Sequence, residues 1–207
     1  MRIGVLASGE GSNLQAILDD AHGRDGVEVV AVGSDKPGAR ALQRARAAGI
    51  PTRAFPRADH PDRRARDAAI AAWLEAAGVE LVVLAGYMQL LDPAFLARFP
   101  GRVINLHPAL LPAFPGIGAV EQAVAYAVKV FGVTVHFVDE GVDTGPIIAQ
   151  RAIELPDARD PAEVRSALRP LEHALLPEAV RLIARGAVAP DPEHPRRVVV
   201  GRYGAAE

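Results

Sequence analysis

Two polar side chains near the middle of the chain have the types and spacing needed for acyl transfer. Asn105 and His107 lie two residues apart in the apolar run 102–107, so both project from one face if this run is a strand. Pro108 follows directly and ends ladder pairing, which places the imidazole at the strand end. An amide beside an imidazole can stabilise an oxyanion and supply a proton. The spacing also fits a histidine that is merely hydrogen-bonded at a strand end, and this alternative stays open.

An acidic, glycine-flanked loop at 138–146 supplies candidates for a carboxylate partner of the imidazole. Asp139, Glu140 and Asp143 all lie in the stretch VDEGVDTGP. A carboxylate next to His107 would favour the charged imidazolium and fix its orientation. The loop lacks the spaced oxygen ligands of an EF-hand, so calcium is not expected. The spacing does not choose among the three acids, and a solvated acidic turn is the simpler alternative.

A glycine-rich turn, SGEGSN at 8–13, joins the first predicted strand to the first predicted helix. Such a turn lets the free N–H groups of a helix start point at an anion, and Ser12 or Asn13 is a candidate cap for that helix. Leu14 replaces the third glycine of the dinucleotide fingerprint and no G-K-[ST] follows, so the turn favours a single phosphate. Asp35, near the end of the second predicted strand, keeps a dinucleotide alternative open.

The elements that must position these residues alternate between short apolar runs and helical stretches. Continuous apolar strands separated by helices predict an α/β fold, with a mostly parallel sheet covered by helices on both faces and a Rossmann-like N-terminal half. The predicted strands are 2–8, 27–34, 52–55, 79–86 and 102–107, and the predicted helices are 12–21, 39–48 and 61–77.

The second half of the chain has a different pattern. A helix is expected at about 119–128, followed by an amphipathic strand at 132–139 that pairs, in antiparallel fashion, with 146–155. A long helix should cover 161–185, where Pro170 and Pro177 predict a kink or a break. The segment after Gly186 is expected to pack as an irregular strand or to fray.

Composition narrows the classes of protein that need to be considered. The chain has 207 residues, a formal net charge of −2 and no cysteine, which excludes disulfides and thiolate catalysis. No apolar run is long enough for a membrane helix, the first apolar run breaks at Gly9, and a cytoplasmic protein is expected. The remaining histidines are scattered, so no metal site is expected; they are His22, His60, His136, His173 and His194.

Three motifs together resemble the phosphoribosylglycinamide formyltransferase family of folate-dependent purine-pathway enzymes. They are SGEGSN at 8–13, INLHPALLPAFPG at 104–116 and GVTVHFVDEGVDTGPIIAQ at 132–150. The resemblance extends to about residue 186. It implies one formyltransferase domain, 1–187, with a nucleotide-binding half at 1–100 and a folate-binding and catalytic half at 101–187, followed by a tail at 188–207. The implied reaction moves the formyl group of 10-formyltetrahydrofolate to the amine of glycinamide ribonucleotide, without a metal.

The resemblance also implies roles for individual residues. The matching catalytic residues are Asn105, His107 and Asp143. Those matching the ribonucleotide site are Gly11, Ser12, Asn13, Arg169 and Glu172. Those matching the folate site are Arg63, Met88, Gln89, Leu90, Leu91 and Asn105, with Asp139, Glu140, Gly141, Val142 and Asp143 from the acidic loop.

Three positions depart from the family pattern. Gln89 stands where the family often has arginine, Gly118 where some members have histidine, and Arg169 where some have glutamine. These departures concern affinity, especially a charged contact to the folate, and leave the catalytic trio intact.

The alternatives are two relatives and one protein of another class. A methionyl-tRNA formyltransferase should carry a further basic domain for tRNA, and a formyltetrahydrofolate hydrolase should carry an N-terminal regulatory domain; the length and charge of this chain favour neither. A non-catalytic nucleotide-binding module would explain the glycine turn but not Asn105, His107 and Asp143. Small-molecule substrates are expected, with no nucleic acid or membrane partner, and the choice between monomer and homodimer stays open.

Overall fold

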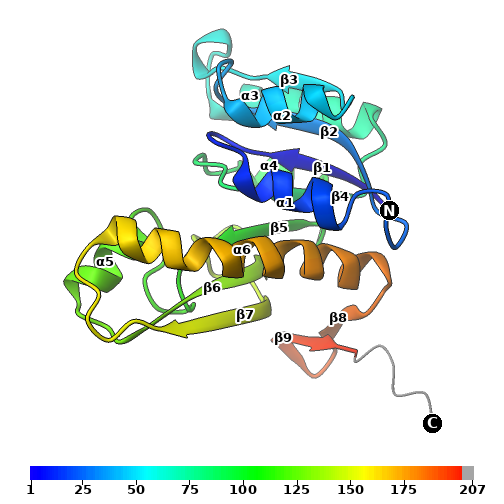
Figure 1. Ribbon diagram of the computed structural model, residues 1–207. Coiled ribbons are helices and arrows are strands. Elements are labelled where there is room, and N and C mark those ends of the chain that lie inside the picture. Colours follow the sequence, from blue (N-terminus) through cyan, green and yellow to red (C-terminus); the bar gives the residue numbers. More distant parts are fainter. Residues whose placement is uncertain (202–207) are drawn as a thin grey trace. The chain divides into compact units, whose positions relative to one another are not determined.

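The computed structural model describes residues 1–201, which divide into two compact units (Figure 1). Unit 1 comprises Met1–Asn105, and unit 2 begins at Leu106. This division follows the density of internal contacts; the predicted extent of the functional domain, 1–187, remains a prediction.

Unit 1 is a parallel sheet with the strand order β3-β2-β1-β4-β5. The strands are β1 (Arg2–Leu6), β2 (Glu28–Ser34), β3 (Thr52–Ala54), β4 (Leu81–Leu84) and β5 (Val103–His107). All four residues of β4 are buried, as are the last four of β1, which agrees with their continuous apolar sequence. The predicted α/β class with mostly parallel strands is confirmed.

Helices cover both faces of this sheet. Helix α1 (Ser12–Asp20) contacts α2 (Arg40–Ala47), while α3 (Arg63–Ala76) contacts α4 (Pro93–Leu96) on the opposite face (Figure 1). A short 3₁₀ turn, η1 (Arg57–Asp59), precedes α3, whose first turn is capped by the Asp62 carboxylate accepting from the Ala65 N–H at 2.7 Å. The sequence analysis did not predict η1 or α4.

The strand order of unit 1 reverses between β1 and β4, so the loops after these two strands emerge side by side. Ser8 joins them directly. Its N–H donates to the carbonyl of Gly86 at 3.0 Å, and its hydroxyl accepts from the N–H of Met88 at 2.9 Å. The glycine turn and the segment 86–91 are therefore one connected structure at the carboxyl edge of the sheet.

Unit 2 contains α5 (Ala119–Ala125), an antiparallel pair of β6 (Val130–Phe137) and β7 (Ile147–Glu154), and the long helix α6 (Pro161–Ala184). The antiparallel pairing confirms the prediction for 132–139 and 146–155. Helix α6 packs on both strands.

One expectation for the C-terminal part is wrong. Helix α6 is not broken at Pro170 or Pro177, because its buried apolar side chains, Pro177 among them, hold it against the strands; the alternative of a kink stays a prediction. The segment after Gly186 forms strands, the first of the two predicted alternatives: β8 (Val188–Asp191) and β9 (His194–Val200) make an antiparallel hairpin whose register shifts between Pro190 and Asp191. The part of the predicted tail from 202 to 207 lies outside the described residues.

Within residues 1–201, no helix combines the length and the hydropathy that crossing a membrane would need.

Candidate active site

His107 ends β5 and is nearly buried, with 4% of its surface exposed. Its Nδ1 lies 3.2 Å from Oδ2 of Asp143, and its Nε2 lies 2.8 Å from the backbone carbonyl oxygen of Phe114. A carbonyl oxygen only accepts hydrogen bonds, so Nε2 is the donor in its contact with Phe114. The His107 ring is therefore oriented from both sides, by the Asp143 carboxylate at Nδ1 and by the Phe114 carbonyl at Nε2.

The acidic loop between β6 and β7 is shaped so that Asp143 faces His107. Asp143 adopts a left-handed backbone conformation with φ of 52°. The loop closes tightly at Gly145, where an added Cβ would lie 1.9 Å from the carbonyl oxygen of Phe137. Asp139 braces the loop internally, because its Oδ1 accepts from the Gly141 N–H at 3.1 Å and from the Thr144 hydroxyl at 2.6 Å. Of the three acids in the loop, Asp143 is the one that pairs with His107, while Glu140 is exposed.

Asp143 is held as a carboxylate. Burial acts to raise its pKa, but the hydrogen bond from His136, the N–H of Gly116 at 2.7 Å and the charges of His107 and His136 outweigh burial. The pKa of Asp143 falls to about 2. Asp143 is therefore an anion throughout the physiological range and presents a negative charge to the His107 ring.

His136, on β6, is a site residue that the sequence analysis did not single out. Its Nε2 lies 3.5 Å from Oδ1 of Asp143, and its Nδ1 donates to the carbonyl oxygen of Phe137 at 2.8 Å. The carboxylate of Asp143 thus lies between two imidazoles. The signal was present in the sequence, since a buried position on an amphipathic strand is an unusual place for histidine.

Asn105 lies on β5 two residues before His107, so the strand projects both side chains from one face as the spacing predicted. Asn105 is the last residue of unit 1 and is half-buried. Its catalytic role remains a prediction.

The predicted phosphate turn in unit 1 has the expected backbone shape. Gly11 is the N-cap of α1 with φ of 72°, and an added Cβ would lie 2.6 Å from Cα of Ala41. No side chain caps the helix, so the expectation that Ser12 or Asn13 does so is wrong. Both residues start the helix, where the backbone N–H groups suit an anion.

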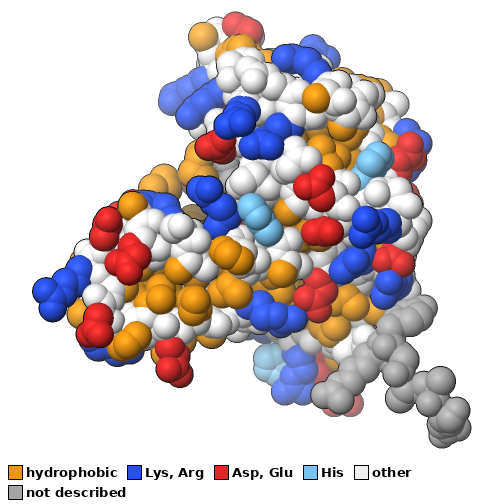
Figure 2. Space-filling model, viewed as in Figure 1, with side chains coloured by type: hydrophobic (Ala, Val, Ile, Leu, Met, Phe, Trp, Pro, Cys, Tyr) orange, Lys and Arg blue, Asp and Glu red, His pale blue; other side chains and the backbone are white. Residues whose placement is uncertain are grey.

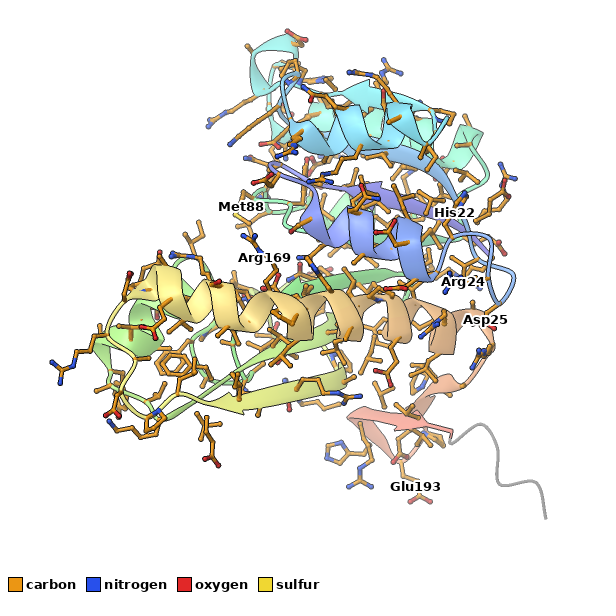
Figure 3. The ribbon with its side chains drawn as sticks, in the orientation of Figure 1. His22, Arg24, Asp25, Met88, Arg169 and Glu193 are labelled. Atoms are coloured by element: carbon orange, nitrogen blue, oxygen red, sulfur yellow. The ribbon has the colours of Figure 1, made fainter. Side chains whose placement is uncertain are left out.

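The segment after β4 contributes exposed apolar side chains and one engaged amide. Met88 is 62% exposed and Leu90 59% exposed, so Leu90 is not core, whereas Leu91 is partly buried. Met88 projects outward from its loop (Figure 3). Gln89 accepts from Arg66 Nη1 at 3.0 Å and donates to Oδ2 of Asp35 at 3.0 Å. Arg63, at the start of α3, lies 3.8 Å from Oδ2 of Asp92.

In unit 2, Arg169 lies on α6 (Figure 3). Glu172 follows three residues later on the same helix, so the two are neighbours on the helix surface. Arg169 is exposed and Glu172 half-buried. Val142 is exposed beside Gly116.

Arg196 of β9 donates to the carbonyl oxygen of Thr144 at 2.8 Å, a contact to the acidic loop that the sequence analysis missed. The described residues contain no group of three or more His, Asp or Glu side chains placed to hold a metal ion.

Comparison with known proteins places these features in one family. Residues 1–180 match the family described as formyl transferase. A phosphoribosylglycinamide formyltransferase of Mycobacterium tuberculosis is 48% identical over 187 residues, covering 90% of this chain and 86% of the relative. That of Bacillus subtilis is 42% identical over 87% of this chain and 93% of its own length.

Solved structures agree with these sequence relatives. The crystal structure of glycinamide ribonucleotide transformylase 1 from Symbiobacterium toebii is 47% identical, covers 97% of this chain and 94% of its own, and superposes with a TM-score of 0.91. The chain therefore belongs to the formyl transferase family and, within it, to the phosphoribosylglycinamide formyltransferases.

Proposed function

We propose that this protein transfers the formyl group of 10-formyltetrahydrofolate to the amine of glycinamide ribonucleotide, releasing tetrahydrofolate. The observation that carries the proposal is the buried His107 imidazole, held between the Asp143 carboxylate and a backbone carbonyl in a chain of this family. A preorganised imidazole that donates a hydrogen bond can stabilise an oxyanion.

The proposed chemistry is a direct transfer. The amine nitrogen attacks the formyl carbon, a C–N bond forms, and the formyl oxygen becomes an oxyanion. Asn105 and His107 stabilise this oxyanion by donating hydrogen bonds. The bond between the formyl carbon and folate N10 then breaks, and N10 takes up the proton that the attacking amine gives up. Asp143 keeps His107 protonated and accepts the amine proton through water on its way to N10.

The contact between His107 and Phe114 bears on how the substrate enters. The Nε2 proton of His107 is already donated to the carbonyl oxygen of Phe114, a residue with φ of 54°. The formyl oxygen must replace this carbonyl as the acceptor. The carbonyl thus keeps the donor correctly oriented before the substrate arrives, and a positive φ at a non-glycine residue is a conformation that the loop can leave without loss of favourable backbone geometry.

The binding roles follow the family resemblance. Gly11, Ser12 and Asn13 would hold the ribonucleotide phosphate through the start of α1, with Arg169 and Glu172 at the ribose. Arg63, the segment 88–91 and the loop 139–143 would hold the folate. Both partners in this proposal are small molecules.

A turnover assay with purified protein tests the proposal. The protein is mixed with 10-formyltetrahydrofolate and glycinamide ribonucleotide, and release of tetrahydrofolate is followed by absorbance. Release that requires the ribonucleotide is the expected result. Release without it would indicate a hydrolase, and no release would favour formylation of another acceptor, such as methionyl-tRNA, or a non-catalytic binding module.

A further inference from the structure

Unit 1 contains a cavity of about 500 Å³ whose lining carries an excess of cations. Arg57, His60, Arg63 and Arg66 line it, against the single carboxylate of Asp62. That carboxylate already accepts from the Ala65 N–H as the cap of α3. On the face of the molecule that Figure 2 shows, Lys and Arg side chains also gather over the part of unit 1 where α2 lies. The lining therefore suits an anion.

Arg66 carries the strongest sign of a missing partner. Its side chain is 3% exposed, and its Nε donates to Oδ1 of Asp67 at 2.9 Å. Its Nη2 lies 2.8 Å from the same oxygen but makes no hydrogen bond within the described part of the chain. A buried guanidinium N–H without an acceptor is costly, and such groups are rare outside binding sites.

Both ends of the Gln89 side-chain amide are hydrogen-bonded within the protein. Its amide oxygen accepts from Arg66 Nη1, and its amide nitrogen donates to Asp35, so neither end is directed to a ligand. Many members of the family have arginine at position 89, which would offer a charged contact to the folate, whereas this chain has glutamine there. In this protein, the guanidinium next to position 89 comes from α3, and Gln89 fixes its position.

We propose that Arg66 binds a carboxylate of the folate donor in this cavity, and that Gln89 is a positioning residue for Arg66 and not itself a folate ligand. The inference rests on the proposed function and names the residues that bind the carboxylate end of the formyl donor. Guanidinium groups pair with carboxylates through parallel hydrogen bonds, and Arg63 offers a second one on the same wall. The exposed side chains of Met88 and Leu90 line the cavity as well and suit the aromatic ring that precedes the carboxylates.

An oxyanion in this cavity has two chemical sources, the glutamate carboxylates of the folate and the phosphate of the ribonucleotide. Calorimetric titration separates them with three probes: tetrahydrofolate, the neutral amide of tetrahydropteroate, which lacks the glutamate and carries no carboxylate, and glycinamide ribonucleotide. We expect Arg66→Ala to weaken tetrahydrofolate binding about 10- to 100-fold and to leave the other two affinities within about twofold. In turnover, the KM for the donor should rise while kcat stays within about threefold.

Two further variants distinguish a binding role from a structural one. Gln89→Arg in the Arg66→Ala background returns a guanidinium to the neighbourhood of Asp35 and should recover at least tenfold of the lost affinity for tetrahydrofolate. Arg64→Ala, which removes an exposed arginine of the same helix outside the cavity lining, should bind all probes like the wild type. If Arg66→Ala does not fold, Arg66→Gln removes the charge with a smaller loss of volume and serves the same comparison.

Several outcomes would overturn the inference. Unchanged tetrahydrofolate affinity in both Arg66 variants, or an equal loss for the tetrahydropteroate amide, would make Arg66 a structural residue while the proposed function stands. A loss confined to the ribonucleotide would assign the cavity to its phosphate. Absence of tetrahydrofolate binding by the wild-type protein would overturn the inference and the proposed function together.

Discussion

Two buried carboxylates, one in each unit, have opposite electrostatic behaviour. Asp67 in unit 1 is fully buried against Arg66, and burial raises its pKa although hydrogen bonds from Arg66 and the Asp92 N–H act against this. Asp143 in unit 2 is 14% exposed, and its pKa is lowered to about 2 despite partial burial. Contact with a cation is therefore not enough to predict how a carboxylate titrates.

The difference lies in what surrounds each carboxylate. Asp67 and Arg66 form a buried ion pair in which Asp67 Oδ1 faces the guanidinium and Arg66 Nη2 is left without a hydrogen bond, and such a pair suits holding one guanidinium in place. Asp143 lies between two imidazoles and receives a backbone N–H as well. The carboxylate in unit 1 thus faces one guanidinium, whereas the carboxylate in unit 2 is held by several hydrogen-bonding groups that favour its charged form.

The largest expected effect is the loss of protein stability when the buried pair of Asp67 and Arg66 is broken. Asp67→Ala leaves Arg66 buried without its anion, and we expect the free energy of unfolding to fall by about 3–5 kcal/mol. Urea denaturation monitored by the fluorescence of Trp73 measures this. Asp157→Ala, at an exposed carboxylate, is the matched control and should change stability by less than about 0.5 kcal/mol. A loss below about 1 kcal/mol for Asp67→Ala would show that the pair is not a closed structural unit.

Activity should depend on unit 2. His107→Ala removes the charged donor, and we expect kcat to fall about 10²- to 10³-fold, with unfolding still cooperative. The matched control is His194→Ala, at an exposed imidazole on β9. Turnover of the His107 variant at the wild-type rate would contradict the proposed mechanism.

The two carboxylates should also differ in how stability depends on pH. The folded-state pKa of Asp143 lies below its unfolded value, so its contribution is complete above about pH 4 and is lost as pH falls toward 2. The contribution is about 2 kcal/mol. Asp143→Asn should remove that acid-dependent part of the unfolding free energy.

The stability contribution of Asp67 should have the opposite pH dependence. Because the pKa of Asp67 is raised in the folded protein, its contribution to the free energy of unfolding decreases as pH rises above the pKa of the unfolded chain. Unfolding free energies of both Asp→Asn variants, measured from pH 2 to pH 6 with Asp157→Asn as reference, test this pair of signs. Equal pH slopes for the two variants would remove the distinction between the units.

The smallest expected effect concerns the hairpin that contacts the acidic loop. Arg196→Ala removes the hydrogen bond to the Thr144 carbonyl, next to Asp143, and we expect the donor KM to rise about two- to fivefold with kcat nearly unchanged. Arg159→Ala, at another exposed arginine of unit 2, is the control. A change in kcat larger than that in KM would mean that the hairpin acts on the catalytic geometry of Asp143 itself.

The sequence alone determined the features that depend on local pattern. Continuous apolar runs predicted β1, β2 and β4 and the parallel sheet, because a strand buried on both faces must be apolar throughout. The two-residue spacing of Asn105 and His107 placed them on one face of β5, since side chains alternate along any strand. The three motifs, the glycine turn among them, were enough to identify the family.

Only the tertiary structure decided which distant residues meet. Of the three acids in the loop, Asp143 pairs with His107, and Asp139 and Glu140 do not. Loop closure at Gly145 turns the Asp143 carboxylate toward His107 and the Asp139 carboxylate into the loop. The tertiary structure also places His136 on the opposite side of the Asp143 carboxylate from His107. Packing keeps α6 continuous through Pro170 and Pro177. These outcomes depend on packing between segments far apart in the chain, and such contacts leave no periodic trace in the sequence.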